Sequence, residues 1–288
     1  MPSETVEILP VRQTTGDWVP SIGSQTLSLF DRLELREEDK EKIKTEAISI
    51  LGKCLSPNLP VGRKTGLVIG YIQSGKTMSF TTLAALAHDN GFKLIIVITG
   101  VTKNLFLQSC ERLQKDLAIN HQRTWKFYQN PPNPKKKPHV IQSIEAAFQS
   151  DNSPIELNKQ TVLMAVMKNS THLRNLIALL KALALRGVPT LVIDDEADQA
   201  SLNTKVRKGG QSTTYQLILD IRDCLPQHTF LQYTATPQAL LLINLIDVLS
   251  PDFAEILTPG TAYTGGQVFF EGDFNLIRRI PPDEIPSR

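Results

Sequence analysis

Short apolar runs separated by polar segments recur through the middle of this chain of 288 residues. The clearest run is 94–98, in which all five residues are aliphatic. Further runs occupy 67–69, 161–167, 191–193 and 229–233. Continuous apolar runs of this length are typical of strands buried on both faces. Helical spacing lies between them, as in 78–88, so the pattern predicts an α/β fold with a parallel sheet flanked by helices.

The first 60 residues have a different pattern. Ser24 or Thr26 is expected to cap a short helix, and a second helix with one apolar face is expected to end before Pro57. We therefore expect a helical N-terminal extension over 1–60. The main lobe is expected over 61–250. A C-terminal segment follows over 251–288, with a candidate hairpin at 259–272 and a proline-rich, irregular tail.

The composition of the chain excludes few classes of function. The chain has 31 basic and 29 acidic residues, so it is not a strongly basic nucleic-acid binder, although a local basic groove remains compatible with these numbers. Its three cysteines form no C-x-x-C pair, which favours buried thiols in a reducing compartment. The N-terminus has no signal-peptide pattern, and the longest apolar run, 239–249, is too short to span a bilayer. The sequence predicts a cytoplasmic protein without a membrane segment.

Residues 129–139 are rich in proline and contain three adjacent lysines. Such a segment is expected to form an exposed, irregular loop. The alternative is a contact with a phosphate backbone, beside the aromatic residues Trp125, Phe127 and Tyr128.

Residues 70–77 fit the phosphate-loop pattern G-x-x-x-x-G-K-[ST], between a predicted strand and a predicted helix. Lys76 is expected to reach the β- and γ-phosphates of ATP, and the Thr77 hydroxyl is expected to bind Mg²⁺. A simple Gly/Ser turn between strand and helix is the alternative. The candidate nucleotide-binding residues are Gly70, Gln73, Ser74, Gly75, Lys76 and Thr77.

An acidic motif, D-D-E-A-D, follows the predicted strand at 191–193. Ligands of open α/β sheets bind where strands end, so these acids are expected at the nucleotide. Asp195 is the expected Mg²⁺ ligand, and Glu196 would orient or deprotonate the attacking water. Asp194 would be structural or would share the metal. A charged turn without a partner is the alternative.

The third motif is T-A-T at 234–236, directly after another predicted strand. Its hydroxyls can hydrogen-bond the acidic motif and report its state. Alone, the pattern has little specificity, because Ser and Thr after a strand often cap a helix. The catalytic candidates are Lys76, Asp195, Glu196 and Thr236.

The order of these three motifs resembles the first RecA-like lobe of the DEAD-like superfamily 2 helicases and translocases. The resemblance implies a nucleic-acid contact after the second strand. The residues there are Thr102, Lys103, Asn104 and Gln108.

The match narrows to the Z-one domain family, bacterial proteins labelled as endonucleases and often encoded near restriction or phage-defence genes. Q-S-G-K-T at 73–77, Lys168-Asn169, I-D-D-E-A-D-Q-A-S-L-N-T at 193–204 and Y-T-A-T-P at 233–237 carry this resemblance. Members are much longer, which implies that this chain is a fragment or a subunit. The chain contains no convincing pair of nuclease acids with an E-x-K element.

The resemblance implies an ATP-binding lobe that acts on nucleic acid, with DNA favoured, in DNA processing or phage defence. A second RecA-like lobe, supplied by a partner, would carry the arginine finger. ATP hydrolysis by the isolated chain is therefore expected to be weak or absent. A non-motor nucleotide-binding scaffold remains an alternative, as does a nuclease on the family label alone. The motif order argues against a kinase.

Overall fold

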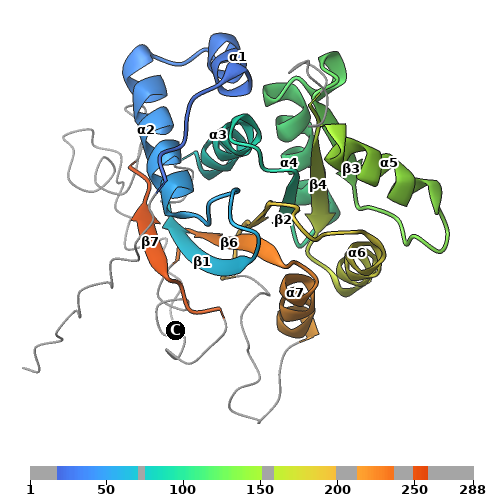
Figure 1. Cartoon of the computed structure of the whole chain (residues 1–288). Coiled ribbons are helices and arrows are strands. Elements are labelled where there is room, and N and C mark those ends of the chain that lie inside the picture. Colours follow the sequence, from blue (N-terminus) through green and yellow to red (C-terminus); the bar gives the residue numbers. More distant parts are fainter. Residues whose placement is uncertain (1–17, 71–74, 151–158, 199–212, 237–248, 259–288) are drawn as a thin grey trace, which may run out of the picture.

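The computed structural model of the chain describes residues 18–70, 75–150, 159–198, 213–236 and 249–258. They form one seven-stranded parallel sheet in the order β3-β4-β2-β5-β6-β1-β7 (Figure 1). The strands are β1 Gly62–Ile69, β2 Leu94–Thr99, β3 Trp125–Gln129, β4 Thr161–Met167, β5 Thr190–Asp194, β6 Gln227–Thr234 and β7 Phe253–Ile256. The predicted α/β fold, a parallel sheet flanked by helices, is confirmed.

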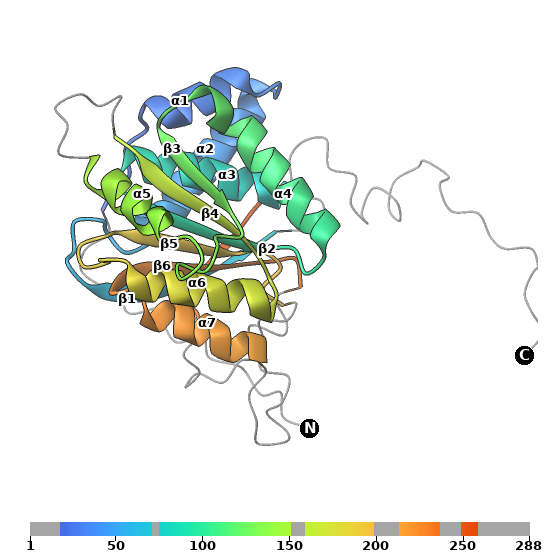
Figure 2. The same ribbon diagram turned by 90° about the vertical axis from the view of Figure 1, so that its right-hand side faces the viewer.

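Helices cover both faces of the sheet (Figure 2). They are α1 Ser24–Arg32, α2 Glu37–Lys53, α3 Lys76–Asp89, α4 Lys103–Asp116, α5 His139–Phe148, α6 Ser170–Ala182 and α7 Thr213–Asp223, with a short 3₁₀ turn, η1, at Ile119–His121. The first four helices lie on one face and the last three on the other. The connections from β1 to β3 therefore cross one face, and those from β3 to β6 cross the other.

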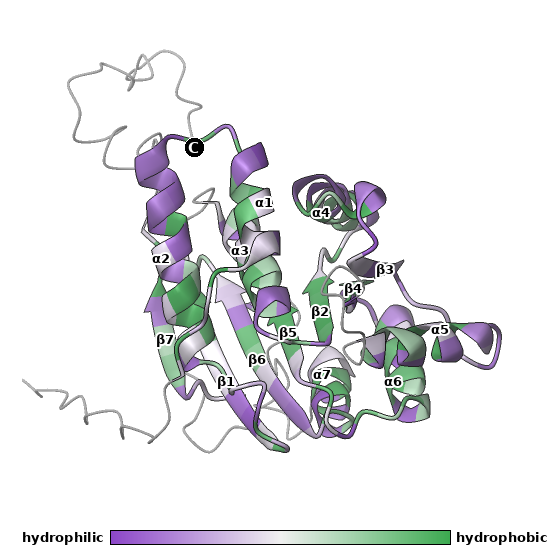
Figure 3. Cartoon of the chain, turned by 45° about the horizontal axis from the view of Figure 1, so that its top comes forward, coloured by the Kyte–Doolittle hydropathy of each residue, from purple (hydrophilic) through white to green (hydrophobic). Residues whose placement is uncertain are grey.

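Strand β2 shows why its sequence forms the centre of this sheet. All six of its residues are buried. Ile95 and Val97 join the apolar cluster under α1–α4, whereas Ile96 and Ile98 join the cluster over α5–α7. In Figure 3 the central strands are coloured as hydrophobic, and the outer turns of α2 as hydrophilic. An all-apolar run is thus explained by burial on both faces.

Three elements were not among the predicted ones: β3, α5 and β7. Strands β3 and β7 lie at the two edges of the sheet, where one side of the strand has no neighbour and polar residues are tolerated. Strand β7 pairs with β1, so the sheet continues past residue 250. The division into an extension, a lobe and a C-terminal segment stays a prediction, and the candidate hairpin at 259–272 lies outside the described residues.

The cap expected for the first helix was wrong. Gly23, not Ser24 or Thr26, is the residue before α1, and it offers no side chain. The Asp89 carboxylate, at the end of α3, accepts hydrogen bonds from the backbone N–H groups of Gly23 (3.0 Å), Gln25 (3.0 Å) and Thr26 (2.9 Å) instead. A carboxylate from a distant helix thus satisfies the unpaired donors at the N-terminus of α1.

Two further expectations can be compared with the described residues. The three cysteines are free; Cys54 and Cys110 are buried, as expected, whereas Cys224 is only partly buried. Among the helices that the structure describes, none is long and apolar enough to cross a membrane.

Candidate nucleotide site

The sheet brings the three motifs to one edge. Strand β6 lies between β1 and β5, and its register pairs Thr234 with Ile69 and Gln232 with Asp194. All three strands are parallel, so the segments that follow them leave the sheet at the same edge. The Gly70 N–H donates to the Thr234 carbonyl (2.9 Å), which fixes the start of the phosphate loop against the start of the T-A-T motif.

The described end of the phosphate loop has the conformation that its glycine permits. Gly75 has φ +86°, in the left-handed region, and precedes α3 directly. A Cβ there would meet no atom within 4 Å, so backbone conformation rather than space favours glycine. Lys76 and Thr77 form the first turn of α3, whose N-terminus attracts anions. Gln73 and Ser74 lie outside the described residues.

Asp195 lies in a mostly buried position opposite the phosphate loop. Its backbone N–H donates to Ile98 O (2.9 Å), and its Oδ2 accepts a hydrogen bond from the Thr99 hydroxyl (3.1 Å). Burial raises the pKa of the Asp195 carboxyl, and the nearby charge of Glu196 adds to this; the Thr99 hydrogen bond and the charges of Lys168 and Lys76 oppose it. The Thr99 hydroxyl thus connects the Asp195 carboxylate to the end of β2.

The other two acids of the turn differ from Asp195. Asp194 is 0% exposed, and its Oδ1 lies 2.7 Å from the Lys168 ammonium nitrogen. Of the two roles expected for Asp194, this contact favours the structural one. Glu196 is partly exposed and has φ +53°, an unusual conformation for a residue with a side chain.

The T-A-T motif makes the hydrogen bonds to the acidic motif that its sequence suggested. Thr234 donates through its hydroxyl to Asp198 Oδ1 (2.7 Å), and Thr236 donates to Asp198 Oδ2 (2.6 Å). The Thr236 N–H also donates to the Thr234 hydroxyl (2.9 Å). Any movement of the end of β6 therefore changes the contacts of the acidic turn.

The nucleic-acid candidates lie together at the start of α4. Thr102 is the N-cap of this helix, and its hydroxyl accepts a hydrogen bond from the Leu105 N–H (3.4 Å). Lys103, Asn104 and Gln108, like Thr102, are exposed. The turn before them is tight: Gly100 has φ +64°, and a Cβ there would lie 2.5 Å from the Phe106 nitrogen.

Two side chains of α4 that the sequence did not single out contact the site. The Ser109 hydroxyl lies 3.0 Å from the Thr99 hydroxyl, which in turn bonds Asp195. The Arg112 guanidinium donates to the Thr77 hydroxyl (3.4 Å). Since residues three apart share one face of a helix, this spacing was the only signal in the sequence. The same helix face thus contacts Thr77 directly and Asp195 through Thr99.

The lysine segment forms an ordered turn after β3. Asn133 accepts hydrogen bonds from the backbone of Lys135, Lys136 and Lys137, and the three lysine side chains are exposed at the edge where the motifs lie. Trp125 is buried and donates through its ring nitrogen to Gln25 (3.2 Å), so its ring is not available to stack on a base. The phosphate-contact interpretation of the lysines stays a prediction.

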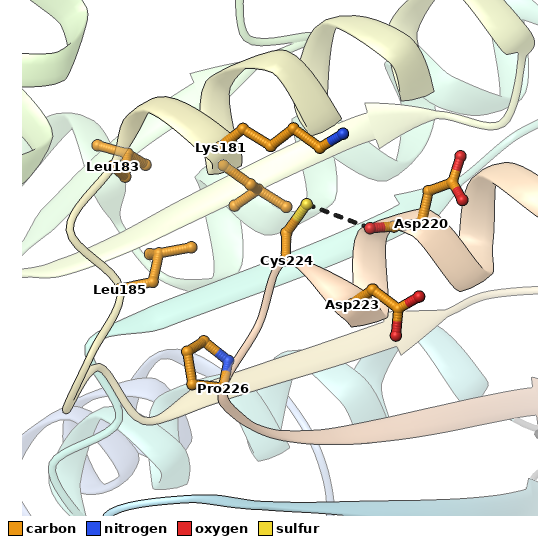
Figure 4. Close-up of a pocket in the computed structure, with 8 residues that line it drawn as sticks. Lys181, Leu183, Leu185, Asp220, Asp223, Cys224 and Pro226 are labelled. Carbon is orange, nitrogen blue, oxygen red and sulfur yellow. Dashed lines mark hydrogen bonds between the residues drawn. The ribbon is translucent and has the colours of Figure 1, made fainter.

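Two cavities within the described part of the chain lie away from this edge. One of about 470 Å³ lies between the ends of α6 and α7, where Lys181, Asp220 and Cys224 border it (Figure 4). Another of about 480 Å³ lies between α1 and the end of α3. Among the described residues, no group of three His, Cys, Asp or Glu side chains could hold a metal ion.

No protein-family model matches the chain, and a search of curated proteins gives no match. Among solved structures, the chain is similar to the Pyrococcus furiosus Hef helicase domain, with 16% identity and a TM-score of 0.45 over 67% of this chain and 34% of that one. It is also similar to the Aeropyrum pernix ORC2 protein in ADPNP–ADP complexes, with 17% identity and a TM-score of 0.30 over 80% of this chain and 50% of that one.

The chain thus spans a third of the length of the Hef domain and half of the ORC2 chain. Similarities this distant carry no information on function, and the resemblance to the Z-one family stays a prediction. What the chain does has to be inferred from the contacts of its own site.

Proposed function

We propose that this chain is an ATP-binding lobe of a helicase- or translocase-type ATPase that acts on nucleic acid, with DNA favoured. The observation that carries the proposal is the convergence of three motifs at one edge of a parallel sheet. Thr234 joins Gly70 to Asp198 through its carbonyl and hydroxyl groups, and Thr99 joins Asp195 to the end of β2. Their order in the sequence supports ATP rather than an unrelated anion.

The residues present fit ATP with Mg²⁺. The left-handed Gly75 and the N-terminus of α3 suit a bound phosphate, with Lys76 as its counter-charge. Thr77 and Asp195 offer the oxygen atoms that Mg²⁺ prefers, and the metal would neutralise phosphate charge. Among the described residues, the hydrogen bond to the Asp195 side chain engages only Oδ2, so Oδ1 remains for a metal or its water.

The remaining motif residues have roles that follow from their positions. Glu196 is partly exposed at the same turn, where its carboxylate would orient or deprotonate a water molecule. Thr236 acts on the acidic motif through Asp198. At the start of α4, Thr102, Lys103, Asn104 and Gln108 would contact nucleic acid, and Ser109 on the same helix leads back to Asp195 through Thr99.

Turnover by the isolated chain is expected to be weak, since an arginine finger supplied by a partner lobe is worth about 10³–10⁵ in rate. The proposal is tested first by titrating the purified chain with a fluorescent ATP analogue in the presence of Mg²⁺. We expect Lys76→Ala to weaken binding at least about tenfold, because one charge-assisted phosphate contact is lost. Lys181→Ala, which removes a lysine at the opposite edge, is the matched control.

The outcomes separate the alternatives. Unchanged affinity in Lys76→Ala would contradict the nucleotide site itself. Vigorous hydrolysis by the homogeneous isolated chain would contradict the need for a partner lobe. The chain could also bind ATP but show no hydrolysis when single-stranded DNA and a second lobe with an arginine finger are added. That result would favour the scaffold alternative.

A further inference from the structure

Lys168 is the first residue after β4, and its side chain is buried beneath the acidic turn. The exposed fraction of the side chain is 1%. Its ammonium group lies 2.7 Å from Asp194 Oδ1 and donates to two backbone carbonyls, Asp195 O at 2.6 Å and Glu196 O at 2.9 Å. Oxygen atoms from three consecutive residues thus surround the ammonium group: two carbonyls accept its hydrogen bonds, and one carboxylate balances its charge.

We propose that Lys168 is a positioning residue, which fixes the turn after β5 so that Asp195 and Glu196 face the phosphate loop. The significance of this position for ATP rests on the function proposed above, whereas the fixing of the turn does not. Lys168 does not touch the nucleotide in this arrangement, because its ammonium lies under the turn and is enclosed by protein.

The backbone of the turn explains why it needs such a contact. Glu196 has φ +53°, a conformation that is unfavourable for a residue with a Cβ and that persists only where surrounding contacts enforce it. Lys168 holds the carbonyls on both sides of this strained torsion, and the Ala197 N–H donates to Tyr233 O (2.9 Å) just beyond it. The direction of the Glu196 side chain follows from this backbone conformation.

The lysine is itself held from both sides. Its own N–H donates to Gly100 O (3.1 Å), which joins the end of β4 to the turn between β2 and α4. The next residue, Asn169, caps α6 by accepting a hydrogen bond from the His172 N–H (3.0 Å). The Lys168-Asn169 pair therefore ties α6, the β2 turn and the acidic turn together.

A purely structural ion pair between Lys168 and Asp194 would behave differently. Buried ion pairs can often be replaced by apolar pairs of similar volume without loss of stability. Such a replacement removes the charges together, but it also removes the two hydrogen bonds to the Asp195 and Glu196 carbonyls. The double variant Lys168→Met with Asp194→Leu therefore separates the stability of the pair from the positioning of the turn.

The test uses hydrogen exchange without nucleotide, followed by Mg²⁺-dependent ATP binding. In the double variant we expect a thermal midpoint close to that of the wild type, faster exchange of the Asp195 and Ala197 amides, and ATP affinity lower by about 10- to 100-fold, as for other groups that orient metal ligands. The matched control is Lys93→Met, which removes a partly buried lysine that also donates to a carbonyl, Phe148 O, at the opposite edge.

Wild-type exchange and affinity in the double variant would overturn the proposal, since Lys168 would then be a charge partner only. Faster exchange in a chain whose wild type binds no ATP would support the fixing of the turn and contradict the proposed function. The single variant Lys168→Met leaves Asp194 buried without its counter-charge and is therefore expected to be unstable. If it does not fold, the double variant alone tests the proposal.

Discussion

The three consecutive acids after β5 have three different environments. Asp194 is buried against Lys168, Asp195 bonds Thr99 at the phosphate edge, and Glu196 is partly exposed on a left-handed backbone. Neighbouring carboxylates usually raise one another's pKa, so distinct partners are needed if each is to have its own role. The turn thereby holds a buried, ion-paired carboxylate, a carboxylate bonded to Thr99 and a partly exposed one; under the proposed function these would be a structural charge, a Mg²⁺ ligand and a group that orients water.

At this scale we expect Asp195→Asn to increase stability while it weakens Mg²⁺-dependent ATP binding. Burial raises the pKa of the Asp195 carboxyl, so its charged form opposes folding above that pKa, and the opposition disappears as the pH falls through it. An amide removes this charge, but it is a poorer Mg²⁺ ligand, which should cost at least about tenfold in affinity. Calorimetry without nucleotide and ATP titration with and without Mg²⁺ measure the two effects.

Asp31→Asn, at an exposed position of α1, should change neither quantity. A less stable Asp195→Asn variant with unchanged Mg²⁺-dependent affinity would show that Asp195 is a structural carboxylate.

The sequence motifs predicted some of the residues of this site. Lys76, Asp195 and Thr236 were identified because each belongs to a motif of adjacent residues. The contacts of Lys168 and Asp89 were not, because their partners lie 27 residues later and about 65 residues earlier in the chain. A pattern of neighbouring residues contains no information on which distant backbone groups a buried side chain will meet.

At the scale of elements, α4 connects the exposed nucleic-acid candidates to the metal-ligand candidates. Its first turn carries Lys103 and Asn104, and two turns later Ser109 and Arg112 reach Thr99 and Thr77. A rigid helix can transmit a small displacement along its length. Binding of a nucleic acid to the first turn is thus in a position to alter the contacts of Thr77 and Asp195.

We expect Arg112→Gln to weaken ATP binding by about three- to tenfold, the effect of one exposed charge contact worth about 1 kcal/mol. The loss should be larger for ATP than for ADP, since the guanidinium lies beside the hydroxyl expected to hold Mg²⁺. Parallel titrations at two salt concentrations measure it. Lys115→Gln removes the same charge from an exposed position of the same helix, and equal losses in both variants would point to a general charge effect.

The elements themselves were predictable in proportion to their burial. Strands β2 and β5 are buried along their whole length and appeared as continuous apolar runs. Strand β7 was missed because its residues alternate between partly buried and exposed, in a stretch of only four. Strand β1 begins at Gly62 rather than at 67, since its first residues are polar and border the solvent. Interior strands can be predicted from their apolar composition, whereas edge strands become evident only from their pairing with a neighbouring strand.

At the scale of the whole molecule, α3 joins the phosphate loop to the N-terminal helices. Its first residues follow Gly75, and its last residue, Asp89, holds the start of α1. Leu29 of α1 and Ile50 of α2 share one buried cluster with Phe80 and Leu83 of α3. The helices before β1 are therefore part of the support of the phosphate loop.

A buried histidine, His228, lies at the opposite edge of the sheet. His228 is 1% exposed; its Nδ1 lies 2.9 Å from Leu225 O, and its Nε2 lies 3.4 Å from Arg222 Nε. A neutral ring that donates from Nδ1 and accepts at Nε2 satisfies both contacts. Burial, together with the charges of Arg222 and Arg63, lowers the pKa of His228 to about 4.

This pKa predicts how stability depends on pH. The unfolded chain takes up a proton near the ordinary histidine pKa of 6.5, and the folded chain only near pH 4, so the free energy of unfolding should fall as the pH falls through this window. The whole window corresponds to about 3 kcal/mol. Urea unfolding at pH 7 and pH 4.5 should show a clearly smaller loss in His228→Asn than in the wild type. His139→Asn, at an exposed position, should keep the wild-type loss, and an equal loss in all three proteins would mean that other groups cause the acid sensitivity.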